Sequence, residues 1–324
     1  MRLPVRVAPC ILILAMLVIA AAPAAGRSPM ALGISQQNGS RDPAAVREFA
    51  GRAGHMPASW TIWSTWGDRA SKRFPTSMAR SLIGMGVTPM IWWVPVRQIR
   101  SCAFARHRLI ARGRYDRYIK QWARDAKAVR GKVIVRWAHE INGSFFPWGV
   151  GQCGNTTGSF KAAWRHIVRI FRRVGATNVR FAWTVSNKPR CRPGPCNPYK
   201  RYFPGARFVD YAGFSSFNWG AHHGKWVPMA DGISASYRKI RAFTKKPIII
   251  IELATNTGAR SKPDWIRHGY PAVYARFPGI KGISYLNVNL RSIGHPDWSL
   301  NTPRPAAMEA YRDVVSQARF QGEY

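Results

Sequence analysis

The stretch V-I-V-R-W-A-H-E, Val133–Glu140, is apolar over most of its length and ends in a carboxylate. A second stretch, K-P-I-I-I-I-E, Lys246–Glu252, has the same form. Runs this short that are apolar on both faces are typical of strands buried in a parallel sheet. The two stretches therefore predict an α/β protein, and they set the pattern to look for elsewhere in the chain.

Six further runs fit that pattern, and amphipathic helical stretches alternate with them. The eight expected strands are Ala31–Gln36, Ser59–Trp63, Val87–Val94, Val133–Ala138, Val179–Val185, Val209–Ser215, Pro247–Glu252 and Gly282–Val288. The clearest expected helices are Arg114–Val129, Ser159–Val174 and Pro305–Ala318, with apolar residues spaced i, i+3, i+4, i+7 on the second. Eight strand–helix units with no linker or repeat between them predict a single-domain (β/α)8 TIM barrel.

Composition supports a folded domain. Of the 324 residues, 46% are hydrophobic and 12% aromatic, which excludes a disordered basic tail. No apolar run of about 18 residues follows the N-terminus, so a multi-pass membrane protein is excluded. No Gly-rich phosphate loop follows the first expected strand, which argues against a nucleotide-binding fold.

The N-terminal segment has the form of a signal peptide. Arg2 and Arg6 are followed by an apolar run, Cys10–Ala22, and then by small residues, Pro23–Gly26. The run is short for a membrane span, although an uncleaved anchor is the alternative. We therefore expect residues 1–26 to be removed, leaving a secreted domain of residues 27–324 with no membrane contact.

Export makes disulfides the expected state of the cysteines. Removal of Cys10 leaves Cys102, Cys153, Cys191 and Cys196, which allow three pairings. Cys191 and Cys196 flank the turn-forming sequence R-P-G-P, so we expect a local bridge there and a Cys102–Cys153 bridge by elimination. A zinc site is the competing interpretation, but the spacing does not fit one. No metal and no cofactor are expected.

Only five glutamates occur in the chain, and two of them follow expected strands. Glu140 follows the fourth strand and Glu252 ends the seventh. The carboxyl ends of barrel strands carry the active sites of TIM-barrel enzymes. Two carboxylates there are the minimum equipment for glycosidic bond cleavage, one as acid/base and one as nucleophile. The structural alternative is that each carboxylate only pairs with a nearby arginine.

The segment R-W-A-H-E-I-N-G-S-F-F-P-W, Arg136–Trp148, resembles the fourth-strand signature of glycoside hydrolase family 26, the β-mannanase family. The resemblance continues in the same order over most of the remaining chain. It runs through F-A-W-T-V-S-N (Phe181–Asn187), Y-F-P-G-A-R-F-V-D-Y-A-G (Tyr202–Gly213), F-N-W-G (Phe217–Gly220), I-E-L-A-T-N-T-G (Ile251–Gly258), K-P-D-W-I (Lys262–Ile266) and F-P-G-I-K-G (Phe277–Gly282).

The resemblance implies a retaining endo-β-glycosidase on a (β/α)8 barrel, with mannan-like or β-glucan-like polysaccharide as substrate. It implies Glu140 as acid/base and Glu252 as nucleophile. It also implies a sugar site around them, to which we assign His139, Asn142, Phe145, Trp148, Phe217, Asn218, Trp219 and Trp298. Aromatic faces suit the C–H-rich faces of sugars, although any single tryptophan can equally be a core residue.

Two positions depart from the family pattern. Phe217 stands where the family usually has a tyrosine that donates to the nucleophile, and Phe145 stands where a tryptophan is usual. Losing a hydrogen bond to a carboxylate disfavours its charged form. A catalytically weakened relative that only binds glycan is therefore the alternative function.

The chain is strongly basic, with 50 Lys and Arg against 14 Asp and Glu and a formal net charge of +36. Such a charge attracts polyanions. The basic residues are spread along the chain and no nucleic-acid-binding motif is visible, so no specific nucleic-acid partner is expected. We expect attraction to acidic glycans or to an anionic cell envelope.

Overall fold

The structure is a computed structural model, and it describes residues 27–36, 41–68, 72–97, 101–187, 198–220, 225–256, 261–302 and 305–324. The expected signal peptide and the expected Cys191–Cys196 bridge lie outside these residues, so both stay predictions. None of the helices in the described ranges has the length and apolar character that a membrane span requires.

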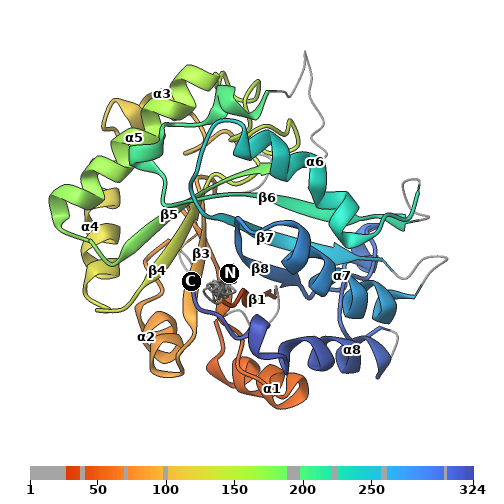
Figure 1. Cartoon of the computed structure of the whole chain (residues 1–324). Coiled ribbons are helices and arrows are strands. Elements are labelled where there is room, and N and C mark those ends of the chain that lie inside the picture. Colours follow the sequence, from red (N-terminus) through yellow and green to blue (C-terminus); the bar gives the residue numbers. More distant parts are fainter. Residues whose placement is uncertain are drawn as a thin grey trace, which may run out of the picture.

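Eight parallel strands close into a barrel in sequence order, as the sequence predicts (Figure 1). The strands are β1 Ala31–Ser35, β2 Ser59–Thr65, β3 Thr88–Val94, β4 Val133–Trp137, β5 Val179–Ser186, β6 Tyr211–Asn218, β7 Ile248–Thr255 and β8 Ile280–Leu286. The α-helices are α1 Pro43–Ala53, α2 Thr76–Gly84, α3 His107–Ala111, α4 Asp116–Lys127, α5 Thr157–Val174, α6 Met229–Arg241, α7 Lys262–Arg276 and α8 Ala306–Val315. The TIM-barrel prediction is confirmed.

Local sequence explains where the longest helix begins and ends. The hydroxyl of Thr156 accepts from the backbone N–H of Ser159, and the Ser159 hydroxyl reciprocally accepts from the Thr156 N–H. This capping box satisfies two N–H groups that would otherwise lack partners at the start of α5. Gly175 ends the helix with a φ of +75°, a conformation that glycine adopts without a steric penalty.

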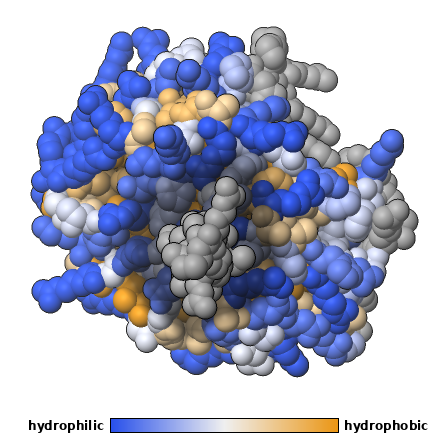
Figure 2. Space-filling view, in the orientation of Figure 1, coloured by the Kyte–Doolittle hydropathy of each residue, from blue (hydrophilic) through white to orange (hydrophobic). Residues whose placement is uncertain are grey.

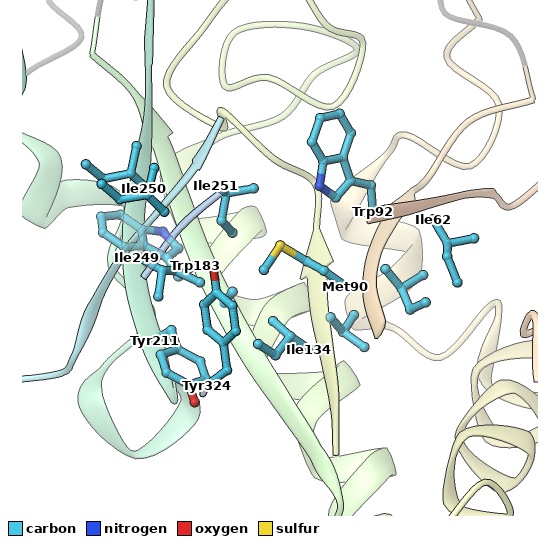
Figure 3. Packing of buried hydrophobic residues seen from close by; sticks show 14 of the residues in the cluster. Ile62, Met90, Trp92, Ile134, Trp183, Tyr211, Ile249, Ile250, Ile251 and Tyr324 are labelled. Atoms are coloured by element: carbon cyan, nitrogen blue, oxygen red, sulfur yellow. The ribbon is translucent and has the colours of Figure 1, made fainter. Parts of the chain in front are cut away.

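Large apolar side chains fill the interior of the barrel. In Figure 3, Met90, Ile134 and Ile251 lie between the strands, with Trp92 at one end of the view and Tyr324 at the other. The ring of Tyr324 lies so close to Gly282 that a Cβ there would be 2.6 Å from its Cε1. The C-terminal aromatic ring therefore packs near the beginning of β8, at the end of the barrel opposite the carboxyl ends of the strands.

The expected C-terminal ends of the strands differ from the structure by up to three residues, most of all in β6 and β7. β6 and β7 continue past Ser215 and Glu252 to Asn218 and Thr255, and they stay paired over this extension. A strand can remain paired at a buried polar residue when the side chain of that residue has a hydrogen-bond partner. Glu252 therefore lies inside β7 rather than at its end.

Candidate active site

The loop after β4 carries Glu140 in a strained backbone conformation. Ala138 and Glu140 have φ values of +46° and +50°, in the left-handed region that non-glycine residues rarely occupy. The backbone N–H of Ala138 donates to Trp93 O (3.3 Å), and the Trp148 Nε1–H donates to His139 O (2.7 Å). Strain of this kind persists only where the surroundings fix it, and it is concentrated at functional sites.

A bulge in β7 sets the direction of the Glu252 side chain. The pairing register of β7 shifts between Ile250 and Leu253 against β8, and that of β6 shifts between Phe214 and Ser215 against β7. A bulge rotates the side chains that follow it, which explains how an otherwise apolar strand presents one carboxylate. Across the β6–β7 ladder, the residue opposite Glu252 is Ser215.

Arg136 connects the strands around Glu252. Its side chain has no exposed surface, and its Nη1 donates to Glu252 Oε2 at 2.7 Å. Its Nη2 donates to Ser215 Oγ at 2.8 Å, and its Nε donates to Thr184 Oγ1 at 2.9 Å. Ser215 Oγ in turn donates to Glu252 Oε2 at 2.9 Å. Two donors, one of them a cation, therefore hold the same carboxylate oxygen.

The two glutamates are buried and share this environment. Glu140 is 7% exposed and Glu252 is 8% exposed. Burial and, after it, the negative charge of Glu252 raise the pKa of Glu140, Arg136 and the hydroxyls of Ser215 and Ser186 oppose the shift, and the resulting pKa is about 7. The first carboxyl can thus hold a proton near neutral pH, next to a carboxylate that receives charge-assisted hydrogen bonds.

His139 lies in an aromatic surround beside Glu140. Its ring centroid is 4.8 Å from that of Phe146, 5.0 Å from Trp148, 5.5 Å from Trp92 and 5.9 Å from Trp63. Burial lowers the pKa of His139 well below its usual value, and the charge of Arg136 lowers it further. His139 is therefore neutral, and its Nδ1 is buried without a hydrogen-bond partner among the described residues.

The side-chain amide of Asn142 is hydrogen-bonded to the backbone of β5. Its Nδ2 donates to Ser186 O at 3.0 Å, and its Oδ1 accepts from the Ser186 N–H at 2.7 Å. Asn218 is also engaged, with Nδ2 donating to Thr255 Oγ1 (2.8 Å) and Oδ1 accepting from the Val227 N–H (3.0 Å). Both predicted sugar-binding amides thus make contacts that fix the rim of the barrel.

The aromatic residues that we assigned to the site differ in exposure. Phe145 is 41% exposed and packs edge-on against Phe146, which stacks on Trp148 at 4.4 Å. Trp148 itself is 1% exposed and lies beneath the stacked ring of Phe146. Of these three rings, Phe145 is the most exposed, and Phe146 is partly buried.

A second aromatic cluster lies at the C-terminal end of β6 and in the segments after β6 and β8. The ring of Phe217 lies 5.4 Å from Trp298 and 6.2 Å from Trp219, and the two tryptophans meet edge-to-face at 5.1 Å. Trp298 is 2% exposed, whereas Phe217 and Trp219 are partly buried. Phe217 is paired with Ala254, two residues beyond Glu252, so the position opposite the expected nucleophile belongs to Ser215.

Four residues of this site were not predicted from the sequence: Trp63, Arg136, Phe146 and Ser215. The sequence could have pointed to Arg136, because an arginine inside an apolar strand is almost never buried without a charged or hydrogen-bonding partner. Ser215 could not be found from the sequence, because its role depends on the register of β6.

The predicted Cys102–Cys153 bridge is present and joins the segments after β3 and β4.

The chain is similar to known proteins in sequence and in fold. The family model for glycosyl hydrolase family 26 matches residues 106–278, which is more than half of the chain. Endoglucanase H of Acetivibrio thermocellus is 32% identical over 211 residues, covering 64% of this chain and 22% of that protein. Beta-1,3-xylanase TXYA of a Vibrio species is 30% identical over 109 residues, covering 33% of this chain and 22% of that protein. The chain thus spans about a fifth of the length of these two relatives.

Solved structures share the fold at lower identity. The catalytic domain of the endo-beta-1,4-mannanase of Bacillus sp. JAMB-750 superposes with a TM-score of 0.68 at 15% identity, covering 91% of this chain and 87% of that one. A beta-mannanase of Bacteroides ovatus superposes with a TM-score of 0.62 at 13% identity, covering 91% of each chain.

Proposed function

Since this chain belongs to glycosyl hydrolase family 26, we propose that it cleaves internal bonds of a β-linked polysaccharide by double displacement, with Glu252 as nucleophile and Glu140 as acid/base. This proposal rests on the different surroundings of the two carboxyl groups. Glu252 receives two donors on one oxygen, while burial raises the pKa of Glu140 to about 7.

In the first step, an oxygen of Glu252 attacks the anomeric carbon while Glu140 gives its proton to the glycosidic oxygen. The carbon–oxygen bond to the leaving sugar breaks, and a glycosyl–Glu252 ester forms. Both donors in the described structure bind Oε2, so we assign the attack to Oε1. In the second step, the Glu140 carboxylate takes a proton from water, the hydroxide attacks the same carbon, and Glu252 leaves.

The aromatic residues would position the sugar. Phe145 provides an exposed ring after β4, and the partly buried Phe217 and Trp219 provide rings after β6. Apolar rings on either side of a pair of buried carboxyls suit a pyranose, which has apolar faces and polar edges. The neutral His139 lies beside Glu140, and no residue of the described ranges forms a hydrogen bond with its Nδ1.

We infer that β-glucan is the first substrate to test, before mannan. Two relatives with at least 30% identity are named as an endoglucanase and a β-1,3-xylanase, whereas the two mannanase structures described above are 13–15% identical. Mannan cleavage, which the resemblance to the family also suggests, is the competing specificity.

A digestion panel tests the activity. Mixed-linkage β-glucan, β-1,3-xylan and β-1,4-mannan would be incubated separately with the protein, and reducing ends and oligosaccharide products would be measured. We expect oligosaccharides from the glucan, with a loss of at least about 10³-fold in Glu252→Gln. Binding to one of these glycans without any release of reducing ends would instead identify a glycan-binding relative without activity.

We also propose that the chain is exported and that residues 1–26 are removed. The Cys102–Cys153 disulfide supports an oxidising compartment. Sequencing the N-terminus of the protein from culture medium should give a chain beginning near Arg27. A cell-bound protein that retains Met1 would contradict this proposal.

A further inference from the structure

The outer face of α4 and α5 carries a dense group of cations. Lys120, Arg124 and Lys127 follow one another at i, i+4 and i+7 on α4, and all three are exposed. On α5, Arg165, Arg169 and Arg172 have the same spacing, and Arg173 lies beside them. An α-helix rises 1.5 Å per residue, so successive cations in each row are about 4.5–6 Å apart along the axis.

The α4 row and Arg173 of α5 border a groove. A cavity of about 560 Å³ lies between the helices and is lined by Lys120, Arg124, Lys127, Ile170, Arg173 and Val174. Four basic and two aliphatic side chains thus line it. α4 and α5 lie side by side in Figure 1, and the same edge of the molecule is mainly hydrophilic in Figure 2.

A second group of guanidinium groups continues the face beyond α5. Four arginines have Cζ atoms within 4.8–5.7 Å of the ring centroid of Phe208, namely Arg165, Arg169, Arg172 and Arg207. The ring is 4% exposed, so the guanidinium groups cover it. Cation–π contact offsets only part of the repulsion between cations held this close together.

These cations lack carboxylate partners within the structure. α5 contains no acidic residue. The ion pairs of the described residues are Arg136–Glu252, His166–Asp116, Arg267–Asp313 and Arg276–Asp231, and none involves a Lys or Arg of α4 or α5. The hydrogen bonds that the side chains of Lys127, Arg165 and Arg172 donate go to backbone carbonyls, which leave the positive charge uncompensated.

We propose that this basic groove binds a linear polysaccharide that carries carboxylates. Regularly spaced cations along an open groove match a polymer with repeating negative charges. The groove shares no residue with the Glu140–Glu252 site, so it would hold the protein on an acidic matrix while that site stays available.

A nucleic acid is a less suitable ligand for this basic groove than an acidic polysaccharide. Single-stranded nucleic acids bind by stacking bases on aromatic rings, but the groove lining has no aromatic residue and Phe208 is covered by guanidinium groups. A duplex is read by an element that enters its groove. α4 and α5 both pack against the barrel, with Ile119, Trp122 and Ile167 buried beneath them.

Two triple variants with the same change in net charge test the proposal. Arg124→Ala/Arg169→Ala/Arg173→Ala removes three exposed arginines from the basic face, and Arg47→Ala/Arg80→Ala/Arg238→Ala removes three from α1, α2 and α6. Affinity for sodium alginate would be measured as a function of salt. We expect the first variant to lose about tenfold or more at 0.1 M NaCl, with a shallower salt dependence, and the control to lose less than about twofold.

Three outcomes would overturn the proposal. Equal losses in the two variants would mean that net charge alone attracts the polymer. Unchanged affinity in the first variant would place binding elsewhere. Tighter binding of a DNA duplex than of alginate, lost in the first variant only, would make nucleic acid the partner. Binding is read directly, so each outcome is independent of whether the protein hydrolyses any glycan.

Discussion

The guanidinium of Arg136 donates from three nitrogens to Thr184, Ser215 and Glu252, and its Cζ lies 4.8 Å from the centroid of the Trp92 ring. A planar group with donors in a fixed fork can satisfy three acceptors at once, which a lysine ammonium on a flexible stem does not reproduce. Arg136 is thus a positioning residue for Glu252, because it fixes one carboxylate oxygen while remaining below the reacting atoms.

Replacing Arg136 with lysine should slow catalysis more than it weakens substrate binding. We expect Arg136→Lys to lower kcat by about 10- to 100-fold, the equivalent of roughly 1.4–2.8 kcal/mol, with little change in KM. Steady-state kinetics on the best soluble glycan measures both. The exposed Arg169→Lys is the matched control and should behave like the unaltered protein; a kcat within twofold of normal in Arg136→Lys would refute the positioning role.

The pKa of Glu140 sets the alkaline limb of the pH profile. An acid catalyst must be protonated, and the Glu140 pKa is raised to about 7 by burial and by Glu252. We expect kcat/KM to fall as pH rises through about 7. In Glu140→Gln, the residual activity on an aryl glycoside with a good leaving group should lose this limb, because such a substrate needs no proton. An alkaline limb that persists in Glu140→Gln would assign it to another group.

The phenylalanine at position 217 should not limit the rate. From the sequence, we expected its ring to lie beside Glu252 and to leave a carboxylate oxygen without a partner. Both described donors, Arg136 and Ser215, bind Oε2, so Oε1 has no donor among the described residues, but two hydrogen bonds to Oε2 already stabilise the charged carboxylate, and the Phe217 ring packs against Trp298. We therefore expect Phe217→Tyr to change kcat by less than about threefold. A gain of ten-fold or more, with the acidic limb moved to lower pH, would show that the phenol is needed.

At the scale of single elements, the segment after β8 depends on a buried lysine. Lys262, the first residue of α7, is 1% exposed, and its Nζ donates to Asp297 O (3.1 Å) and Ser299 O (2.8 Å). Burial lowers its pKa to about 8. The two carbonyls flank Trp298, so the ammonium fixes the residue that packs against Phe217 and Trp219.

Removing this ammonium should loosen the segment. Lys262→Met leaves two carbonyls without their donor, and we expect the free energy of unfolding to fall by about 2–3 kcal/mol. KM should rise more than kcat falls, because the aromatic cluster after β6 loses its support. Urea denaturation and steady-state kinetics measure these changes. The exposed Lys245→Met should stay within about 0.5 kcal/mol, and an equally small effect of Lys262→Met would contradict the account.

Sequence periodicity was enough to predict the elements but not their ends. All eight expected strands exist, because buried parallel strands need apolar residues on both faces and that requirement is visible in the sequence. β6 and β7 extend three residues further than expected, since Ser215 and Glu252 are satisfied by Arg136 and each other. Which polar side chains meet depends on barrel register and on the β7 bulge, and neither leaves a local signature.

At the scale of the whole molecule, order along the chain predicted the closed barrel, and export predicted the Cys102–Cys153 bridge. Net charge was known from composition, but its concentration on α4 and α5 was not. That concentration arises because α5 has five Lys and Arg residues and no acid, and because packing brings Lys120, Arg124 and Lys127 of α4 beside Arg173 of α5. Composition gives the sum of charges, and only the fold gives their arrangement.

The pairing of Glu140 and Glu252 as acid/base and nucleophile is tested most directly by azide rescue of Glu140→Ala. An aryl β-glycoside with a good leaving group would be turned over with and without sodium azide, and the product identified by NMR. We expect azide to accelerate turnover and to yield the β-glycosyl azide, because azide attacks the glycosyl–Glu252 ester from the face that Glu140 vacates. Undiminished turnover of polysaccharide by Glu140→Ala, or an α-glycosyl azide, would contradict this mechanism.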